Sequence, residues 1–228
     1  MLENRKEFKY FVPENEDSKL ILKIEQNCQE IYKKRAINSI YLDTVDFSIF
    51  KNNLESDSET VKYRFRFYDK NIQNNKFEKK INRNGTKFKL TNTEYFYHQN
   101  NIGPYIIDNL LLYPKALVRF NRSYYKYKNT RVTVDKNLEF IKPIMHDLNE
   151  FRINQNIIII EQKILNSNDD SIEKNLLFPQ RKYSKFIESF KALYPLQMWE
   201  DRASIQSSRV CRGNRNGQIF FLFVYEEQ

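Results

Sequence analysis

Basic residues recur at every second position in several segments of the chain. In KYRFRFYD, Lys62, Arg64 and Arg66 alternate with three aromatic residues. Successive side chains of a β-strand point to opposite faces of a sheet, so this segment would have one basic and one apolar face. One such strand is also typical of a solvated surface, but the alternation recurs at 5–10, 77–81, 87–89 and 131–135. The pattern indicates a sheet with a cationic face suited to phosphates or another polyanion.

Acidic residues interrupt this cationic pattern at three positions, Glu7, Glu78 and Glu161. Divalent ions such as Mg²⁺ and Mn²⁺ prefer oxygen ligands and bridge phosphates. Each glutamate, taken singly, is more simply read as the ion-pair partner of a neighbouring Lys or Arg. As a set, they indicate a metal site. The charged face either meets open solvent or lines the interior of a closed barrel, where anions or metals would have to compensate the crowded charge.

Further phosphate-binding candidates lie outside these segments. Arg122 belongs to the strand-like FNRSYYK, and Lys182 and Lys185 lie three residues apart at the start of an expected helix. Helix N-terminal amides favour anions, although an ordinary solvated lysine pair fits the spacing equally well. Neither GxxxxGK[ST] nor GxGxxG occurs, which excludes P-loop and Rossmann phosphate binding.

The composition sets the broad class. The 228 residues contain 38 Lys+Arg and 29 Asp+Glu, a net charge of +9, and 40% are hydrophobic, which is enough for a core. Two cysteines and two histidines cannot form a zinc framework of known spacing. No apolar run is long enough for a membrane helix, and charged residues occupy the place of a signal peptide's apolar stretch. We expect a cytoplasmic protein with no transmembrane segment.

Strand-like runs dominate the chain, which favours an α+β domain built on antiparallel sheet. The expected strands are Arg5–Val12, Ser39–Asp43, Val61–Asp69, Lys76–Asn82, Thr86–Leu90, Ala116–Lys128, Arg131–Asp135 and Arg152–Leu165. The expected helices are Ser18–Lys33, Asp46–Asn53, Pro104–Leu112 and Ser184–Leu193. The first of these would place Cys28 on its apolar face, as a core thiol rather than a reactive one.

The end of the chain differs in composition. After Lys191 the basic residues are all arginines, and the chain closes on the apolar run QIFFLFVY at 218–225. We expect a domain over 1–199 and an atypical tail over 200–228, either disordered or foreign to the domain. A terminal strand of the sheet is the alternative.

A series of motifs in fixed order resembles one known family. KEFKYFVP, SIYLDTVDFSIF, KYRFRFYD, FEKKINRNGTKFK, RFNRSYYK, RVTVD, IIIIEQKI and RKYSKF together are similar to the catalytic domain of the VTC (vacuolar transporter chaperone) polyphosphate polymerases. These belong to the triphosphate tunnel metalloenzymes, relatives of the CYTH-type triphosphatases. The resemblance runs from about Arg5 to Phe190.

The resemblance implies a closed antiparallel β-barrel with flanking helices and a basic tunnel. It implies an ATP:polyphosphate phosphotransferase that uses Mn²⁺ or Mg²⁺ to move the γ-phosphate of ATP onto a growing polyphosphate chain. It assigns catalytic contacts with the triphosphate to Lys9, Arg64, Arg66 and Lys80. It assigns further substrate binding to Lys89, Arg122, Arg131, Lys182 and Lys185, and the metal to Glu161 with Glu7.

The chain departs from the CYTH relatives at its first strand. Their E-x-E-x-K becomes Arg5-x-Glu7-x-Lys9 here, which speaks against a simple hydrolase. The alternatives are a hydrolase of inorganic or nucleoside triphosphates and a non-catalytic module that binds polyphosphate. No nucleic-acid partner is expected, because the aromatic residues alternate to the face opposite the cations, where they cannot stack on bases.

Overall fold

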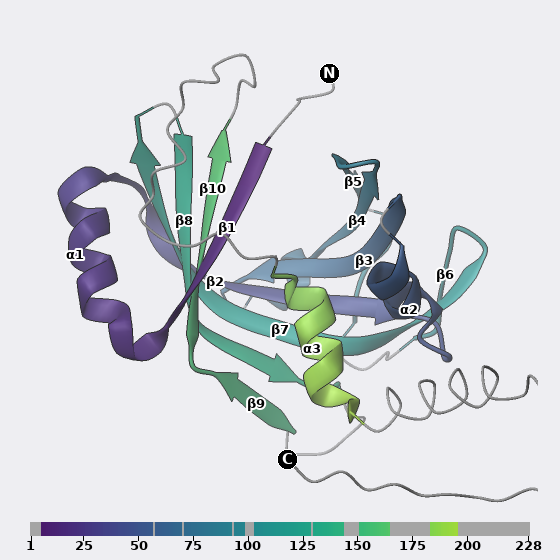
Figure 1. Cartoon of the computed structure of the whole chain (residues 1–228). Coiled ribbons are helices and arrows are strands. Elements are labelled where there is room, and N and C mark those ends of the chain that lie inside the picture. Colours follow the sequence, from purple (N-terminus) through teal and green to yellow (C-terminus); the bar gives the residue numbers. More distant parts are fainter. Residues whose placement is uncertain are drawn as a thin grey trace, which may run out of the picture. The chain divides into compact units, whose positions relative to one another are not determined.

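The computed structural model describes residues 6–56, 58–69, 71–92, 94–98, 103–128, 130–143, 151–164 and 183–195. The chain divides into a compact unit, Met1–Leu193, and a second unit, Tyr194–Gln228. The expected tail over 200–228 lies outside the described residues and stays a prediction. Figure 1 shows the elements of the first unit. Its strands are β1 (Lys6–Pro13), β2 (Gln29–Asp43), β3 (Glu59–Tyr68), β4 (Lys76–Arg83), β5 (Thr86–Asn92), β6 (Tyr105–Ile107), β7 (Leu110–Tyr127), β8 (Thr130–Ile141), β9 (Arg152–Gln155) and β10 (Ile157–Ile164). Its helices are α1 (Asp17–Asn27), α2 (Ser48–Glu55) and α3 (Lys185–Leu193), with short 3₁₀ turns at Glu14–Glu16 and Ile72–Asn74.

The strands form one antiparallel sheet, as expected for an α+β domain. Its hydrogen-bonded order is β1-β10-β8-β7-β2-β3-β4-β5, with β6 paired to β7 and β9 paired to β8. The first strand of the chain therefore ends up at one edge of the path, and the β4–β5 hairpin at the other.

The expectation of a closed barrel is wrong for the described strands. No backbone pairing joins β1 to β5 within the part of the chain that the structure describes. The sheet nevertheless curls, which brings its two edges together. The Lys87 ammonium on β5 lies 3.0 Å from a carboxylate oxygen of Glu7 on β1. The backbones of paired strands lie only about 4.8 Å apart. Two edges that meet through two long side chains are farther apart than that, so they form no backbone ladder.

The register places the alternating charges on one continuous face. Arg64 of β3 lies opposite Glu78 of β4 and Tyr41 of β2, and Lys62 lies opposite Lys80. Glu161 of β10 lies opposite Thr133 of β8. Directly opposed residues point to the same side of a sheet, so the alternation predicted from the sequence is confirmed across the sheet.

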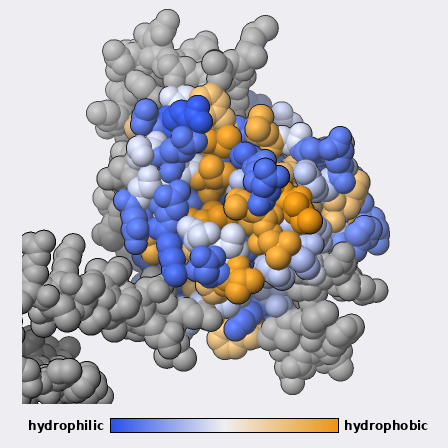
Figure 2. All heavy atoms as spheres, turned by 90° about the vertical axis from the view of Figure 1, so that its right-hand side faces the viewer, coloured by the Kyte–Doolittle hydropathy of each residue, from blue (hydrophilic) through white to orange (hydrophobic). Residues whose placement is uncertain are grey.

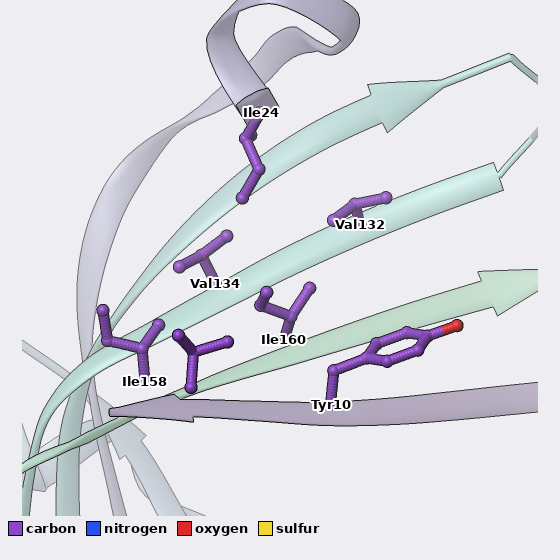
Figure 3. Close-up of a cluster of buried hydrophobic side chains, with 7 residues drawn as sticks. Tyr10, Ile24, Val132, Val134, Ile158 and Ile160 are labelled. Atoms are coloured by element: carbon purple, nitrogen blue, oxygen red, sulfur yellow. The ribbon is translucent and has the colours of Figure 1, made fainter. Parts of the chain in front are cut away.

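Helix α1 covers the other face at the β1–β10–β8 end. Its Ile24 points at Val134 and Ile160 in the cluster drawn in Figure 3, to which Tyr10, Val12, Val132 and Ile158 also belong. All of these side chains are buried. Cys28 packs against the cluster, which agrees with its predicted place in the core, and burial raises the pKa of its thiol.

Helices α2 and α3 pack on each other through aromatic side chains. Phe50 of α2 stacks on Phe190 of α3 with ring centroids 5.3 Å apart, and Phe186 of α3 meets Tyr41 on the charged side of β2. Asp43, at the end of β2, accepts the backbone N–H groups of Ile49 and Phe50. This buried carboxylate thereby satisfies amide groups at the start of α2 that would otherwise lack partners.

Two predicted helices differ from the structure. Ser18–Lys33 is helical only to Asn27, because Gln29 and Glu30 pair with β7 and begin a 15-residue strand. Pro104–Leu112 is the β6–β7 hairpin, where Asp108 and Asn109 both have positive φ. That conformation is the one a two-residue hairpin turn requires, and Asp and Asn adopt it more readily than most residues.

The remaining predicted elements are present, with longer or shifted bounds. The expected strand Arg152–Leu165 is interrupted at Asn156, and the expected helix Asp46–Asn53 begins at Ser48. The face drawn in Figure 2 carries a patch of hydrophobic side chains. The β6–β7 hairpin exposes Ile106, Leu110 and Leu111. None of the described helices has the length and apolar character needed to span a membrane.

Candidate functional site

Eleven cations and four carboxylates gather on the charged side of the sheet and on the first turn of α3; Lys76 and Lys126 share that side of their strands but lie outside this set. We call this set the cationic face. It consists of Lys9, Lys62, Arg64, Arg66, Lys80, Lys87, Lys89, Arg122, Arg131, Lys163 and Lys185 with Glu7, Glu78, Asp135 and Glu161. Eleven positive charges against four negative ones leave an excess of seven.

Glu161 lies among four cations of this face. Its carboxylate oxygens lie 3.8 Å from Lys9, 3.5 Å from Arg122, 3.5 Å from Lys163 and 3.8 Å from Lys185. Burial by itself would raise the pKa of Glu161, but these cations outweigh burial and hold the pKa well below its ordinary value. Glu161 is therefore ionised at neutral pH.

Asp135, beside Glu161, forms two close ion pairs. The Arg122 guanidinium donates to both of its carboxylate oxygens, at 2.6 and 2.7 Å, and the Lys185 ammonium lies 2.6 Å away. Asp135 is fully buried. Burial raises the pKa of its carboxyl, but Arg122 and Lys185 prevail and lower it. Asp135 thereby joins α3 to the sheet and orients Arg122.

Glu78 is the acidic partner of the cations on β3 and β5. Its Oε2 accepts the Arg64 Nε at 2.8 Å, and Lys89 and Arg66 lie 3.3 and 4.0 Å from its oxygens. Arg66 also donates to the Ser39 hydroxyl. Burial opposes ionisation of Glu78, but Arg64 and Arg66 hold its pKa far below the ordinary value.

Glu7 connects the two edges of the sheet. It lies 3.0 Å from Lys87 of β5 and 3.6 Å from Lys163 of β10. Burial and the neighbouring Glu161 raise its pKa, yet Lys9, Lys163 and Lys87 lower it overall. Lys9 itself donates to the backbone carbonyl of Tyr183, just before α3.

Some cations of this face have no carboxylate within ion-pair distance among the described residues. Lys80 is one; the charge of Arg64, followed by burial and Arg66, holds its pKa well below the ordinary value. The Nε of Arg131 is buried without a hydrogen-bond partner in the part of the chain described, and so is the Thr133 hydroxyl on the same strand. Buried polar groups without partners are costly, so these positions favour an incoming anion.

The structure brings most of the predicted site residues together. Lys9, Arg64, Arg66, Lys80, Lys89, Arg122 and Lys185 lie on the cationic face with Glu161 and Glu7, and Arg131 lies on the same face of β8. Lys182 lies outside the described residues.

The sequence placed Lys62, Lys87, Asp135 and Lys163 on strand faces but predicted none of them as a site residue. All four share the strand face of a predicted site residue, so alternation was the available signal. Their partners depend on contacts between distant strands, and no local pattern contains that information.

The carboxylates can be compared with what a divalent cation requires. Glu161 and Glu7 both lie within 4 Å of the Lys163 ammonium. No group of three or more His, Cys, Asp or Glu side chains suitable for a metal occurs among the described residues. Magnesium commonly uses one or two carboxylates and completes its shell with phosphate oxygens and water. The donor set therefore fits a divalent ion that arrives together with a phosphate.

Several solved structures show similarity to this chain. A "putative adenylate cyclase" from Bacillus halodurans has 13% identity and a TM-score of 0.43, covering 92% of this chain and 96% of that one. Its namesake from Vibrio parahaemolyticus has 11% identity and a TM-score of 0.44, covering 85% and 88%. A Hippeastrum protein described as having a dominant triphosphatase activity has 12% identity and a TM-score of 0.40, covering 70% and 79%. No protein of curated function matches the chain.

A family model identifies the chain more directly. The model of the VTC domain matches residues 4–194. This range includes every described strand and helix α3, and hence all residues of the cationic face. It also agrees with the resemblance noted in the ordered sequence motifs. The chain belongs to the VTC domain family.

Proposed function

We propose that the protein is a metal-dependent polyphosphate polymerase that transfers the γ-phosphate of ATP to the end of a polyphosphate chain. The observation that supports this most is the uncompensated charge of the cationic face, where eleven cations oppose four carboxylates. Crowded cations repel one another by several kcal/mol per close pair in a partly buried site. A polyphosphate ligand would remove that repulsion along its whole length.

The cations divide into those already oriented and those left free for substrate. Arg64 and Arg122 are held rigidly by Glu78 and Asp135, so their remaining N–H groups present fixed donors. Lys80 and Arg131 have no carboxylate partner within the described residues. Together these groups would hold the triphosphate and the acceptor chain in line, and such positioning accounts for most of the catalysis of phosphoryl transfer.

The transfer itself needs no oxidant, reductant or covalent enzyme intermediate. A terminal oxygen of the polyphosphate chain attacks the γ-phosphorus and forms a new P–O–P link. The bond between the γ-phosphorus and the β–γ bridging oxygen breaks, and ADP leaves with the electron pair. Arg64, Arg66 and Lys80 would neutralise the charge that develops on the transferred group and on the leaving oxygen.

Glu161, with Glu7 beside it, would hold the metal. A bound Mn²⁺ or Mg²⁺ would neutralise charge on phosphate oxygens. Both carboxylates have lowered pKa values and stay ionised at neutral pH, as metal ligands must. The four cations around Glu161 would then be released from it to contact phosphate.

The ionised state of the carboxylates at neutral pH favours transfer over hydrolysis. Hydrolysis gains from a base that accepts a proton from water, and such a base works best with a pKa near 7. The described carboxylates of the cationic face are held well below that range by Lys and Arg. A polyphosphate acceptor oxygen is already deprotonated and needs no base.

The test is incubation with ATP and Mn²⁺, followed by a gel stained for polyphosphate and an assay of released orthophosphate. We expect a ladder of long anionic chains that an exopolyphosphatase removes. The matched controls are Arg66→Met, which should form no ladder, and Arg83→Met, whose exposed arginine pairs with Glu59 outside the cationic face. Orthophosphate without a ladder would identify a hydrolase, and neither product would indicate a binding module.

A further inference from the structure

We infer that Lys62 is an additional phosphate-binding residue, which contacts the ligand where β3 meets the start of α3. This inference rests on the proposed function and adds to it a residue that the sequence placed on a cationic strand face but to which the family resemblance assigns no role. It stands on the position of Lys62, on its partners and on the charges around it.

Lys62 lies on the cationic face two residues before Arg64. The register of β3 and β4 places it directly opposite Lys80. Its ammonium donates to the Ser184 hydroxyl at 3.1 Å and lies 5.6 Å from the centroid of the Phe186 ring. No ion pair of Lys62 occurs within the part of the chain that the structure describes.

Ser184 marks the N-terminus of α3. Its hydroxyl accepts the Ile187 N–H and its carbonyl accepts the Glu188 N–H, as an N-cap residue does. Helix N-termini carry a partial positive charge and favour anions. Lys62 therefore adds its positive charge at a helix end whose partial charge also favours anions.

The charged groups that face Lys62 come from four strands, and all but one of them are cationic. Lys9 and Glu7 belong to β1, Lys87 to β5, and Arg64 to its own strand. Lys80 faces it from β4. Ser184, the residue before α3, and Phe186 of α3 also face it. Glu7 is the single carboxylate among these groups, and Lys87 and Lys163 already pair with it.

These surroundings destabilise the charged form of Lys62. Burial, followed by the charges of Lys9, Lys87 and Arg64, lowers the pKa of Lys62 to about 8. A phosphate bound beside it would raise that pKa again, since an opposite charge at close range favours the ammonium form. Binding above pH 8 must therefore be accompanied by proton uptake at Lys62.

The experiment is calorimetric titration of the full chain with inorganic triphosphate at pH 8.5, without metal. Each titration is repeated in Tris and in a sulfonate buffer, whose different ionisation enthalpies report the protons taken up. Lys62→Met should bind about tenfold to a hundredfold more weakly, the range for loss of one charge-assisted hydrogen bond. Lys62→Arg should keep most of the affinity but take up fewer protons, because arginine is already charged. Proton uptake that remains in Lys62→Arg would come from other groups, among them Lys80, whose pKa is also lowered.

The control variant is Lys79→Gln, which removes one positive charge from the neighbouring strand on the opposite face of the sheet, where Lys79 pairs with Asp108. Its affinity should match the wild type. Thermal unfolding of Lys62→Met should show little loss of stability, since loss of the hydrogen bond to Ser184 is offset by relief of the repulsion from Lys9, Lys87 and Arg64. Equal affinity of Lys62→Met and wild type would overturn the inference while leaving the proposed function intact. A wild-type chain that binds no triphosphate would overturn both.

Discussion

The ammonium of Lys185 lies 2.6 Å from a carboxylate oxygen of Asp135, which precedes it by fifty residues. This contact joins the first turn of α3 to the middle of β8. The same carboxylate holds Arg122, so one buried acid orients two cations that come from different elements. The charged part of the face is thus built around a few acids, each of which serves several bases.

Substitution of Asp135 should therefore damage folding as well as function. Asp135→Asn would leave Arg122 and Lys185 with Glu161 as their remaining counter-charge, which they share with Lys9 and Lys163. Removing one partner of a buried pair costs about 3–5 kcal/mol. We expect a loss of that size in the free energy of unfolding measured in urea. Asp108→Asn is the control, because that half-exposed carboxylate pairs with Lys79 at the surface and should cost less than about 1 kcal/mol. Equal losses in the two variants would contradict the central place of Asp135.

Arg66 is the best position to separate catalysis from stability. Its contacts within the protein are a hydroxyl, Ser39, and Glu78 at 4.0 Å, whereas Arg64 is buried against Glu78. Arg66→Met should lower polyphosphate synthesis by a factor of about 100 or more, the loss of a positioned transition-state donor. Its midpoint of thermal unfolding should stay within a few degrees of wild type. Strong unfolding of this variant would mean that the arginine is structural.

Glu161→Gln tests the proposed metal ligand. A neutral amide is a poor ligand for Mn²⁺ or Mg²⁺, so we expect turnover no longer to rise with added metal. The measurement is the initial rate of polyphosphate formation across a Mn²⁺ titration. Glu139→Gln serves as the control, because Glu139 pairs with Arg119 and Arg152 away from the cationic face. Metal-stimulated turnover that survives in Glu161→Gln would exclude Glu161 as the ligand.

Lys62 should make the stability of the ligand-free protein depend on pH in the alkaline range. Its pKa is about 8 in the folded chain and about 10.4 in an unfolded one. Between these values the unfolded state binds more protons, so the contribution of Lys62 to stability rises with pH. Wild type should therefore gain stability relative to Lys62→Met between pH 8 and pH 9.5, in urea unfolding without phosphate. A constant difference across that range would show that the pKa is not lowered.

The alternation of residue types predicted which side chains share a face. Arg64, Arg66, Lys80 and Glu161 were placed correctly relative to their apolar neighbours, because parity along a strand is a local property. The contact of Asp135 with Lys185 was not predictable, since it depends on how α3 docks against β8. The same holds for the curl of the sheet, which accumulates over the whole path of strands.

Misassigned helices show the same limit. An apolar spacing of three and four residues continued through Ile31, yet the backbone from Gln29 onward pairs with β7. Helix propensity over such a short segment stabilises it less than a row of backbone hydrogen bonds to a neighbouring strand does. The Asp108-Asn109 turn was a usable signal for a hairpin and was missed.

The two edges of the sheet are joined through the ion pair of Glu7 and Lys87, with no backbone ladder between them in the described part of the chain. A polymer held inside a ring of hydrogen-bonded strands can enter or leave only by threading an end. An edge-to-edge contact made by two side chains can part without breaking a single backbone hydrogen bond. On the proposed function, phosphate groups would compete with Glu7 for Lys87, so that a long polyanion would loosen this contact and enter sideways, between its two ends.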